Sequence, residues 1–111
     1  MADKNQGPED PIESELVRED ASFADIVVEF VDGLEARLNT MRTAVETRDF
    51  ESLRIAAHQL KGSGGGYGYP QLTEQAADLE QRANAQTLEE CREALDGLRK
   101  LCDRVVVGGD D

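Results

Sequence analysis

The chain of 111 residues contains no tryptophan and a single histidine, and only 5% of its residues are aromatic. Strand signals are also scarce, since the only cluster of β-branched residues is the valine run at 105–107. No apolar run approaches the length of a membrane span, and the polar first ten residues lack the core of a signal peptide. We therefore expect a small helical protein of the cytoplasm.

Positive charge is scarce as well, because 12 Lys and Arg face 24 Asp and Glu, a formal net charge of -12. Nucleic acids and anionic membranes are bound by concentrated Lys and Arg, so we expect neither as a partner. The cysteines Cys91 and Cys102 are eleven residues apart in a predicted helix, roughly 16 Å, which is too far for a disulfide. Two distant cysteines and one histidine are too few to bind zinc. We expect reduced cysteines and no metal site.

Helical periodicity is abundant in the chain. The pattern predicts a short helix over residues 11–19, with Ile12 and Leu16 as its buried pair. A long helix then follows from an N-cap at Ser22 to about residue 48. Its apolar residues recur at steps of one, three and four, as on one face of a helix: Phe23, Ile26, Val27, Phe30, Leu34, Leu38, Met41 and Val45.

Three more helices are predicted after this one. Asp49 is the expected N-cap of the first, which carries His58 and runs into a glycine-rich segment that obscures its end. Pro70 opens the second, and Thr87 with Glu90 forms a capping box for the third. Their apolar stripes are Phe50, Leu53, Ala57 and Leu60; Leu72, Ala76, Leu79 and Ala83; and Leu88, Cys91, Leu95, Leu98, Leu101, Cys102 and Val105.

Four amphipathic helices with short connections predict an all-α fold. The expected architecture is an antiparallel up-down-up-down four-helix bundle with a short extra N-terminal helix. The bundle would span residues 11–107, after a disordered lead at 1–10 and before a frayed C-terminus at 108–111.

The lone histidine lies in a chemically distinctive setting. At about 100° per residue, His58 falls beside the core stripe of its helix, so we expect it to be partly exposed. Arg54 at i−4 and Lys61 at i+3 lie on the same face, where they would stabilise an added phosphoryl group. Gly62 at i+4 removes a side chain that would crowd the histidine. The alternative is that both cations are ordinary solvated helix charges and that Gly62 starts a frayed helix end.

The segment His58-Gln59-Leu60-Lys61-Gly62-Ser63, with Gly68 ten residues after the histidine, resembles the signature of histidine phosphotransfer (HPt) domains. The resemblance covers residues 12–105. The glycines at 64–66 depart from it, because the family usually has helix-compatible small residues there.

The resemblance implies a phosphorelay intermediate, a phosphoryl carrier without kinase activity of its own. His58 would accept a phosphoryl group from a receiver-domain aspartate and pass it to another receiver. Lys61 would hold the phosphoryl oxygens and Gly62 would leave room for the receiver. Further candidates for phosphoryl stabilisation or docking are Arg54, Gln59 and Gly65, and Gly68 is expected to form a structural turn.

The implied partners are receiver domains of response regulators, with a hybrid sensor kinase as a further candidate. We expect no cofactor on this chain, Mg²⁺ on the partner receiver, and a monomer. The alternative function is a non-phosphorylated helical adaptor that docks a signalling partner through the same face. A nucleotide-binding loop is excluded, since no register of the glycine run gives G-x-G-x-x-G and Lys61 precedes the glycines.

Overall fold

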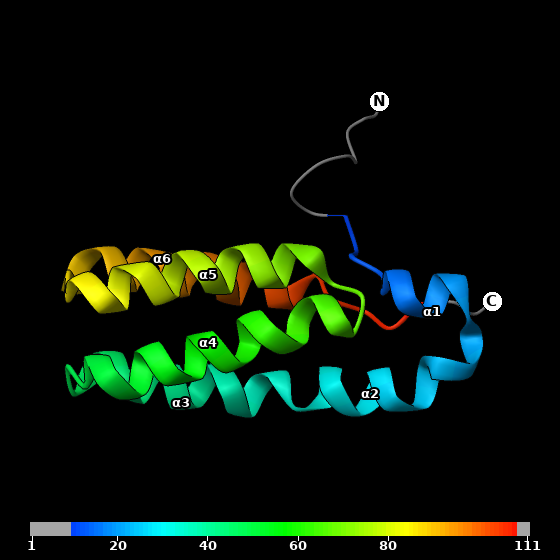
Figure 1. Cartoon of the computed structure of the whole chain (residues 1–111), viewed down its shortest axis with the longest axis horizontal. Coiled ribbons are helices and arrows are strands. Elements are labelled where there is room, and N and C mark those ends of the chain that lie inside the picture. Colours follow the sequence, from blue (N-terminus) through cyan, green and yellow to red (C-terminus); the bar gives the residue numbers. More distant parts are fainter. Residues whose placement is uncertain (1–9, 109–111) are drawn as a thin grey trace.

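The computed structural model describes residues 10–108 and shows a helical bundle (Figure 1). In Figure 1 the chain runs along the long axis in one direction through α2 and α3 and returns through α4. It then reverses direction again in α5 and once more in α6. The predicted all-α four-helix bundle with an extra N-terminal helix is confirmed. The elements are α1 (Glu15–Glu19), a 3₁₀ turn η1 (Ala21–Phe23), α2 (Ala24–Asp32), α3 (Leu34–Glu46), α4 (Phe50–Gly66), α5 (Pro70–Ala85) and α6 (Leu88–Asp103).

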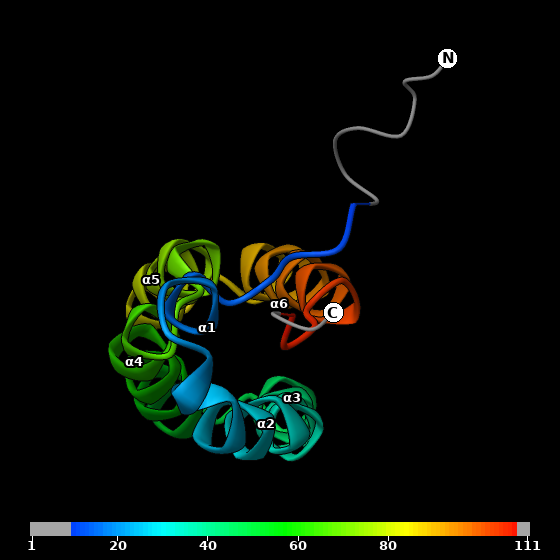
Figure 2. The same cartoon turned by 90° about the vertical axis from the view of Figure 1, so that its right-hand side faces the viewer.

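One hydrophobic core lies along the axis of the bundle. Figure 2 shows the helices of the bundle end on. The predicted stripes supply most of it, and burying each leucine in full contributes roughly 1.5–3 kcal/mol. The buried stripe residues include Leu34, Leu38, Met41 and Val45 of α3; Leu53, Ala57 and Leu60 of α4; Leu72, Ala76, Leu79 and Ala83 of α5; and Cys91 and Leu98 of α6. The cysteines Cys91 and Cys102 are free, as predicted.

The predicted long helix over residues 22–48 is divided in the structure. It breaks at Gly33, whose ψ of -6° departs from the helical value, so that α2 ends before it and α3 begins after it. The predicted cap at Ser22 is wrong: the Ser22 amide donates to Asp20 Oδ1 at 3.0 Å, so Asp20 caps the 3₁₀ turn η1, and α2 begins after Phe23 without a side-chain cap. Near this end the predicted stripe residues Phe23 and Ile26 are exposed.

The predicted first helix is shorter than expected. It starts at Glu15, after Ser14, whose hydroxyl accepts a bond from the Val17 amide at 3.2 Å. Ile12 is buried as predicted, but in an extended segment instead of a helix, and its expected partner Leu16 is only half-buried.

The last helix is also shorter than expected, because α6 ends at Asp103. The valines beyond it favour extended backbone. They run beside Ile12, whose amide donates to the Arg104 carbonyl at 2.8 Å and whose carbonyl accepts from Val106 at 2.9 Å. The two ends of the bundle segment are therefore joined by a short parallel bridge between Ile12 and Val105.

All three later helices start where the sequence predicts. The Ser52 amide donates to Asp49 Oδ1 at 3.1 Å, which confirms that cap, and Pro70 opens α5 as predicted. Thr87 is the N-cap residue of α6 as predicted, but the capping box is not formed, because the Thr87 hydroxyl donates to the Glu90 carboxylate at 3.3 Å and no side chain caps a backbone amide there.

The ends of the chain lie largely outside the described residues. The predicted disordered lead and frayed C-terminus fall there, apart from Asp10 and Gly108, and they stay predictions. Within residues 10–108, the structure contains no helix with the length and apolar character that crossing a membrane requires.

Candidate functional site

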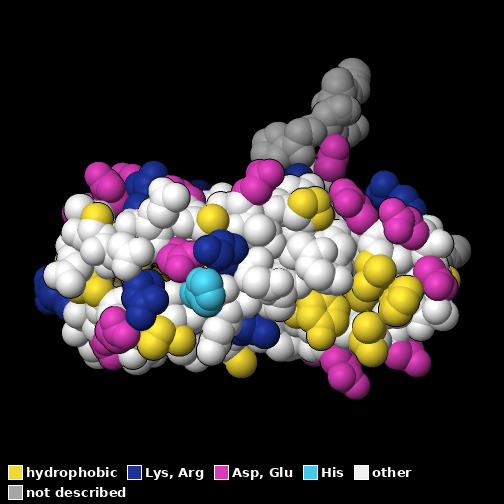
Figure 3. Space-filling model, in the orientation of Figure 1, with side chains coloured by type: hydrophobic (Ala, Val, Ile, Leu, Met, Phe, Trp, Pro, Cys, Tyr) yellow, Lys and Arg dark blue, Asp and Glu magenta, His cyan; other side chains and the backbone are white. Residues whose placement is uncertain are grey.

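The histidine lies at the surface of α4, beside the core stripe. Its side chain is 62% exposed, while the neighbouring stripe residues Ala57 and Leu60 of the same helix are fully buried. Figure 3 shows the ring, in cyan, on the face where basic and acidic side chains surround it. The predicted exposure of His58 is therefore confirmed.

A carboxylate from the neighbouring helix binds both the histidine and the lysine. Glu80 of α5 lies 3.0 Å from His58 Nδ1 through Oε2 and 2.7 Å from Lys61 Nζ through Oε1. Its side chain is only 15% exposed. The hydrogen bond from Lys61 is the main cause of a lowered pKa at Glu80; desolvation opposes the shift and the hydrogen bond with His58 adds to it. Glu80 is therefore an ionised acceptor in this site.

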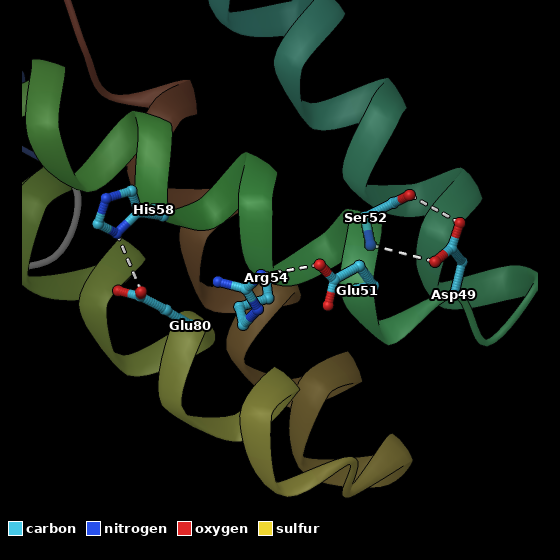
Figure 4. A network of polar contacts seen from close by, with 6 residues as sticks. All are labelled: Asp49, Glu51, Ser52, Arg54, His58 and Glu80. Atoms are coloured by element: carbon cyan, nitrogen blue, oxygen red, sulfur yellow. Dashed lines mark hydrogen bonds and ion pairs between the residues drawn. The ribbon is translucent and has the colours of Figure 1, made fainter.

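The contact with Glu80 determines how the imidazole can react. An ionised carboxylate only accepts hydrogen bonds, so Nδ1 of His58 must carry the proton in this contact. In the neutral ring the lone pair then resides on Nε2. Figure 4 shows the second ring nitrogen on the side of the ring away from Glu80. The site thus presents a nucleophilic nitrogen on an exposed ring.

The two cations expected around the histidine are both matched by carboxylates. Arg54 is paired with Glu51 on its own helix at 2.9 Å, and Lys61 is paired with Glu80 (Figure 4 shows the Arg54 pair). Arg54 therefore resembles the ordinary helix charge of the alternative interpretation, since exposed pairs of this kind are worth little. The surface of α4 around His58 therefore carries paired positive and negative charges instead of an excess of positive charge. Among residues 10–108, no three His, Cys, Asp or Glu side chains are grouped to hold a metal ion.

The surface next to the histidine is open at Gly62. A Cβ built at Gly62 would meet nothing within 4 Å. Gln59 beside it is exposed, and its carbonyl accepts a bond from the Ser63 hydroxyl at 3.0 Å. The predicted gap one turn from His58 is therefore present.

The glycine run continues α4 to Gly66 instead of ending it, and its members have different surroundings. At Gly64 a Cβ would lie 2.9 Å from Leu72 Cβ, so this glycine permits the close approach of α4 and α5. The exposed Gly65 donates its amide to the Thr73 hydroxyl at 2.8 Å. Gly65 thus contacts α5, whereas the sequence predicted for it a role in phosphoryl stabilisation or docking.

The predicted structural turn at Gly68 is present. Its φ is +96°, a left-handed conformation that favours glycine. A Cβ there would also collide with Ser14 Oγ and lie 2.5 Å from the Leu16 amide nitrogen. The turn thereby leads from the histidine helix into α5 underneath α1.

Sequence reasoning missed Glu80 and Thr73, both of which act across the contact between α4 and α5. A signal for Glu80 exists once one contact of this antiparallel pair is known. His58 lies seven residues before Gly65 on α4, and Glu80 lies seven residues after Thr73 on α5. Because the two helices run in opposite directions, the Gly65–Thr73 contact places Glu80 opposite His58.

A model of the Hpt domain family matches residues 25–108, which is most of the chain. The chain therefore belongs to the Hpt domain family. Comparison with curated proteins gave no match, and comparison with solved structures gave none either. Membership assigns the chain a phosphotransfer role in two-component signalling, as a phosphoryl carrier instead of an enzyme, with receiver domains as the class of partner.

Proposed function

We propose that this protein is a phosphorelay intermediate. His58 accepts a phosphoryl group from the phosphoaspartate of one receiver domain and donates it to the aspartate of another. The observation that carries the proposal is the exposed imidazole whose Nδ1 is engaged by Glu80, which leaves the Nε2 lone pair free to attack.

The transfer step follows from this arrangement. The Nε2 lone pair forms a bond to phosphorus while the bond between phosphorus and the aspartyl oxygen breaks, and the aspartate carboxylate stays on the receiver. The Nδ1 proton remains between the ring and Glu80. The ring gains positive charge in this step, and the adjacent Glu80 carboxylate compensates it. Return transfer to a second aspartate reverses the same bonds.

Lys61 is proposed to stabilise the transferred group. Its ammonium is bound to Glu80 at 2.7 Å and its side chain is partly exposed, so it has a flexible stem with which to reach phosphoryl oxygens one turn away. Phosphorylation would thus draw Lys61 from the carboxylate to the phosphoryl group, while Glu80 keeps its bond to the ring. Positioning and charge stabilisation of this kind are the main means of catalysing phosphoryl transfer.

The receiver is proposed to dock over the open surface at Gly62. Gln59 borders this surface, and the exposed Ile55 one turn before the histidine extends it. Arg54 and Gly65 are weaker candidates for docking, because each already has a partner within the protein. The Mg²⁺ and the acceptor aspartate would belong to the receiver, and we propose that the protein acts as a monomer in the cytoplasm.

Incubation with phosphorylated receiver domains tests the proposal. The wild-type protein should acquire phosphate that is labile in acid and stable in alkali, and His58→Gln should acquire none, because the chain has one histidine. Lys100→Gln, at an exposed position on α6 away from this surface, is the control and should still be labelled. Equal labelling of wild type and His58→Gln would refute the assignment. The adaptor alternative instead predicts an unlabelled wild type and intact partner binding by His58→Gln.

A further inference from the structure

A threonine of α5 is inserted into the backbone hydrogen bonding of α4. The Thr73 hydroxyl donates to the Lys61 carbonyl at 2.8 Å and accepts from the Gly65 amide at 2.8 Å. Lys61 and Gly65 are four residues apart, which is the pair that an α-helix joins directly. A side chain between such a pair connects α5 to the main chain of α4.

The part of α4 that Thr73 contacts is intrinsically weak. Four of the five residues from 62 to 66 are glycine, and each glycine disfavours a helix by about 1 kcal/mol relative to alanine. The structure nevertheless keeps this segment helical up to Gly66. Hydrogen bonds from a neighbouring helix supply the helix stability that the local sequence lacks. The hydrogen bonds of the Thr73 hydroxyl, here called the Thr73 tether, provide it in the turn that follows Lys61.

Thr73 and Glu80 lie on the same face of α5, since seven residues are about two turns of a helix. Glu80 binds the side chain of Lys61, while Thr73 binds the carbonyl of the same residue. The lysine is therefore held by α5 at its head and at its main chain.

We propose that Thr73 is a positioning residue for phosphoryl transfer: it fixes the backbone from which Lys61 reaches the phosphoryl group on His58. This proposal rests on the phosphorelay function proposed above. A hydroxyl that served stability alone would change the folding free energy without acting through Lys61.

The test measures the rate of phosphoryl transfer from a phosphorylated receiver to wild type, Thr73→Val, Lys61→Gln and the double variant. Thr73→Val keeps the shape and removes the hydroxyl, and it should slow transfer roughly three- to tenfold, the equivalent of one hydrogen bond. In the Lys61→Gln background it should have no further effect, because the group that it positions is gone. Thr73→Ser, which keeps the hydroxyl, should restore the rate.

Amide hydrogen exchange at Gly65, followed by NMR, reports the tether independently of activity and should quicken in Thr73→Val. If Thr73→Val does not fold, Thr73→Ala replaces it in both measurements. An unchanged transfer rate, or equal slowing with and without Lys61, would overturn the role of Thr73. A wild-type protein that no phosphorylated receiver labels would instead overturn the phosphorelay function, and the positioning role with it.

Discussion

The two sides of the bundle are built in different ways. On one side α4 and α5 approach so closely that a Cβ at Gly64 would lie 2.9 Å from Leu72 Cβ. On the other side α3 and α6 border a cavity of about 270 Å³ that is open to solvent, with Leu38, Val45 and Leu95 among the residues that line it. The side that carries His58 is the closely packed one.

The polar contacts differ in the same way. Across the α4–α5 contact they join two helices, as Glu80 does with His58 and Lys61. Around the α3–α6 cavity the ion pairs of Arg42, Arg92 and Arg99 each stay within one helix and are exposed. Exposed pairs of this kind contribute about 0.2–1 kcal/mol at most. The contacts that hold side chains in place between helices therefore lie on the α4–α5 side, where phosphoryl transfer is proposed to occur.

The largest effect is expected at the turn that closes the α4–α5 side. Gly68→Ala combines a left-handed backbone with backbone atoms of Leu16 and Glu15 within 3 Å of the new Cβ, so it should destabilise the protein by about 3 kcal/mol or more. Urea unfolding measures this. Gly66→Ala, where a Cβ meets nothing within 4 Å, is the control and should be neutral or stabilising. A loss of stability below about 1 kcal/mol in Gly68→Ala would show that α1 moves away from the new methyl group at little cost.

A smaller loss is expected inside α4. Gly64→Ala should cost about 1–3 kcal/mol, because its methyl group would meet Leu72 Cβ and the Thr73 backbone. Gly62→Ala, in open space two residues earlier, should gain up to about 1 kcal/mol from helix propensity. It should also slow phosphoryl transfer, since the methyl group enters the proposed docking gap. Equal stability changes at the two glycines would remove the distinction between the packed and the open face of α4.

Most of the fold could be predicted from the sequence, because the apolar residues recur with the period of a helix and the same residues pack against the other helices in the core. The stripes of α4 and α5 are buried as expected, except that Phe50 at the start of α4 is only partly buried. The prediction failed at the ends of elements. At Ile12 and beyond Asp103 the preference for a buried extended pair outweighs the helical pattern, and this pairing joins residues that are far apart in the chain.

The candidate site was predictable as far as it lies on one helix. His58, Lys61 and Gly62 share a face of α4, and helical spacing alone places them together. Glu80 and Thr73 come from α5, and their contacts depend on the register between the two helices. That register is set by the close approach at Gly64, which the glycine-rich sequence permits without specifying it.

A third pair of substitutions compares the two sides by enlarging one leucine on each. Leu79 on α5 is fully buried, so Leu79→Phe should overpack the core and cost about 1–3 kcal/mol. Leu95 borders the cavity between α3 and α6, so Leu95→Phe has room for the added atoms and should change stability by less than about 1 kcal/mol. Thermal unfolding compares both variants with the wild type. A larger loss at Leu95 would mean that the α3–α6 side is closed in solution.

The smallest effect is expected from the pH dependence of stability. The pKa of Glu80 is lowered in the folded protein, chiefly by the hydrogen bond from Lys61. A carboxyl group with a lowered pKa stabilises the fold above its unfolded pKa, and the contribution is lost as the pH falls through the folded value. Wild type should therefore exceed Glu80→Gln in stability near neutral pH, by less than about 1 kcal/mol, and the difference should shrink in acid.

Urea unfolding of wild type and Glu80→Gln across the acid range measures this difference. The same comparison in a Lys61→Met background is the control, because it removes the main cause of the pKa shift. There the pH-dependent part should become smaller. If the difference between wild type and Glu80→Gln stays constant as the pH falls, the carboxylate does not hold His58 and Lys61 in solution. The α4–α5 side would then owe its precision to packing at Gly64 and to the Thr73 tether alone.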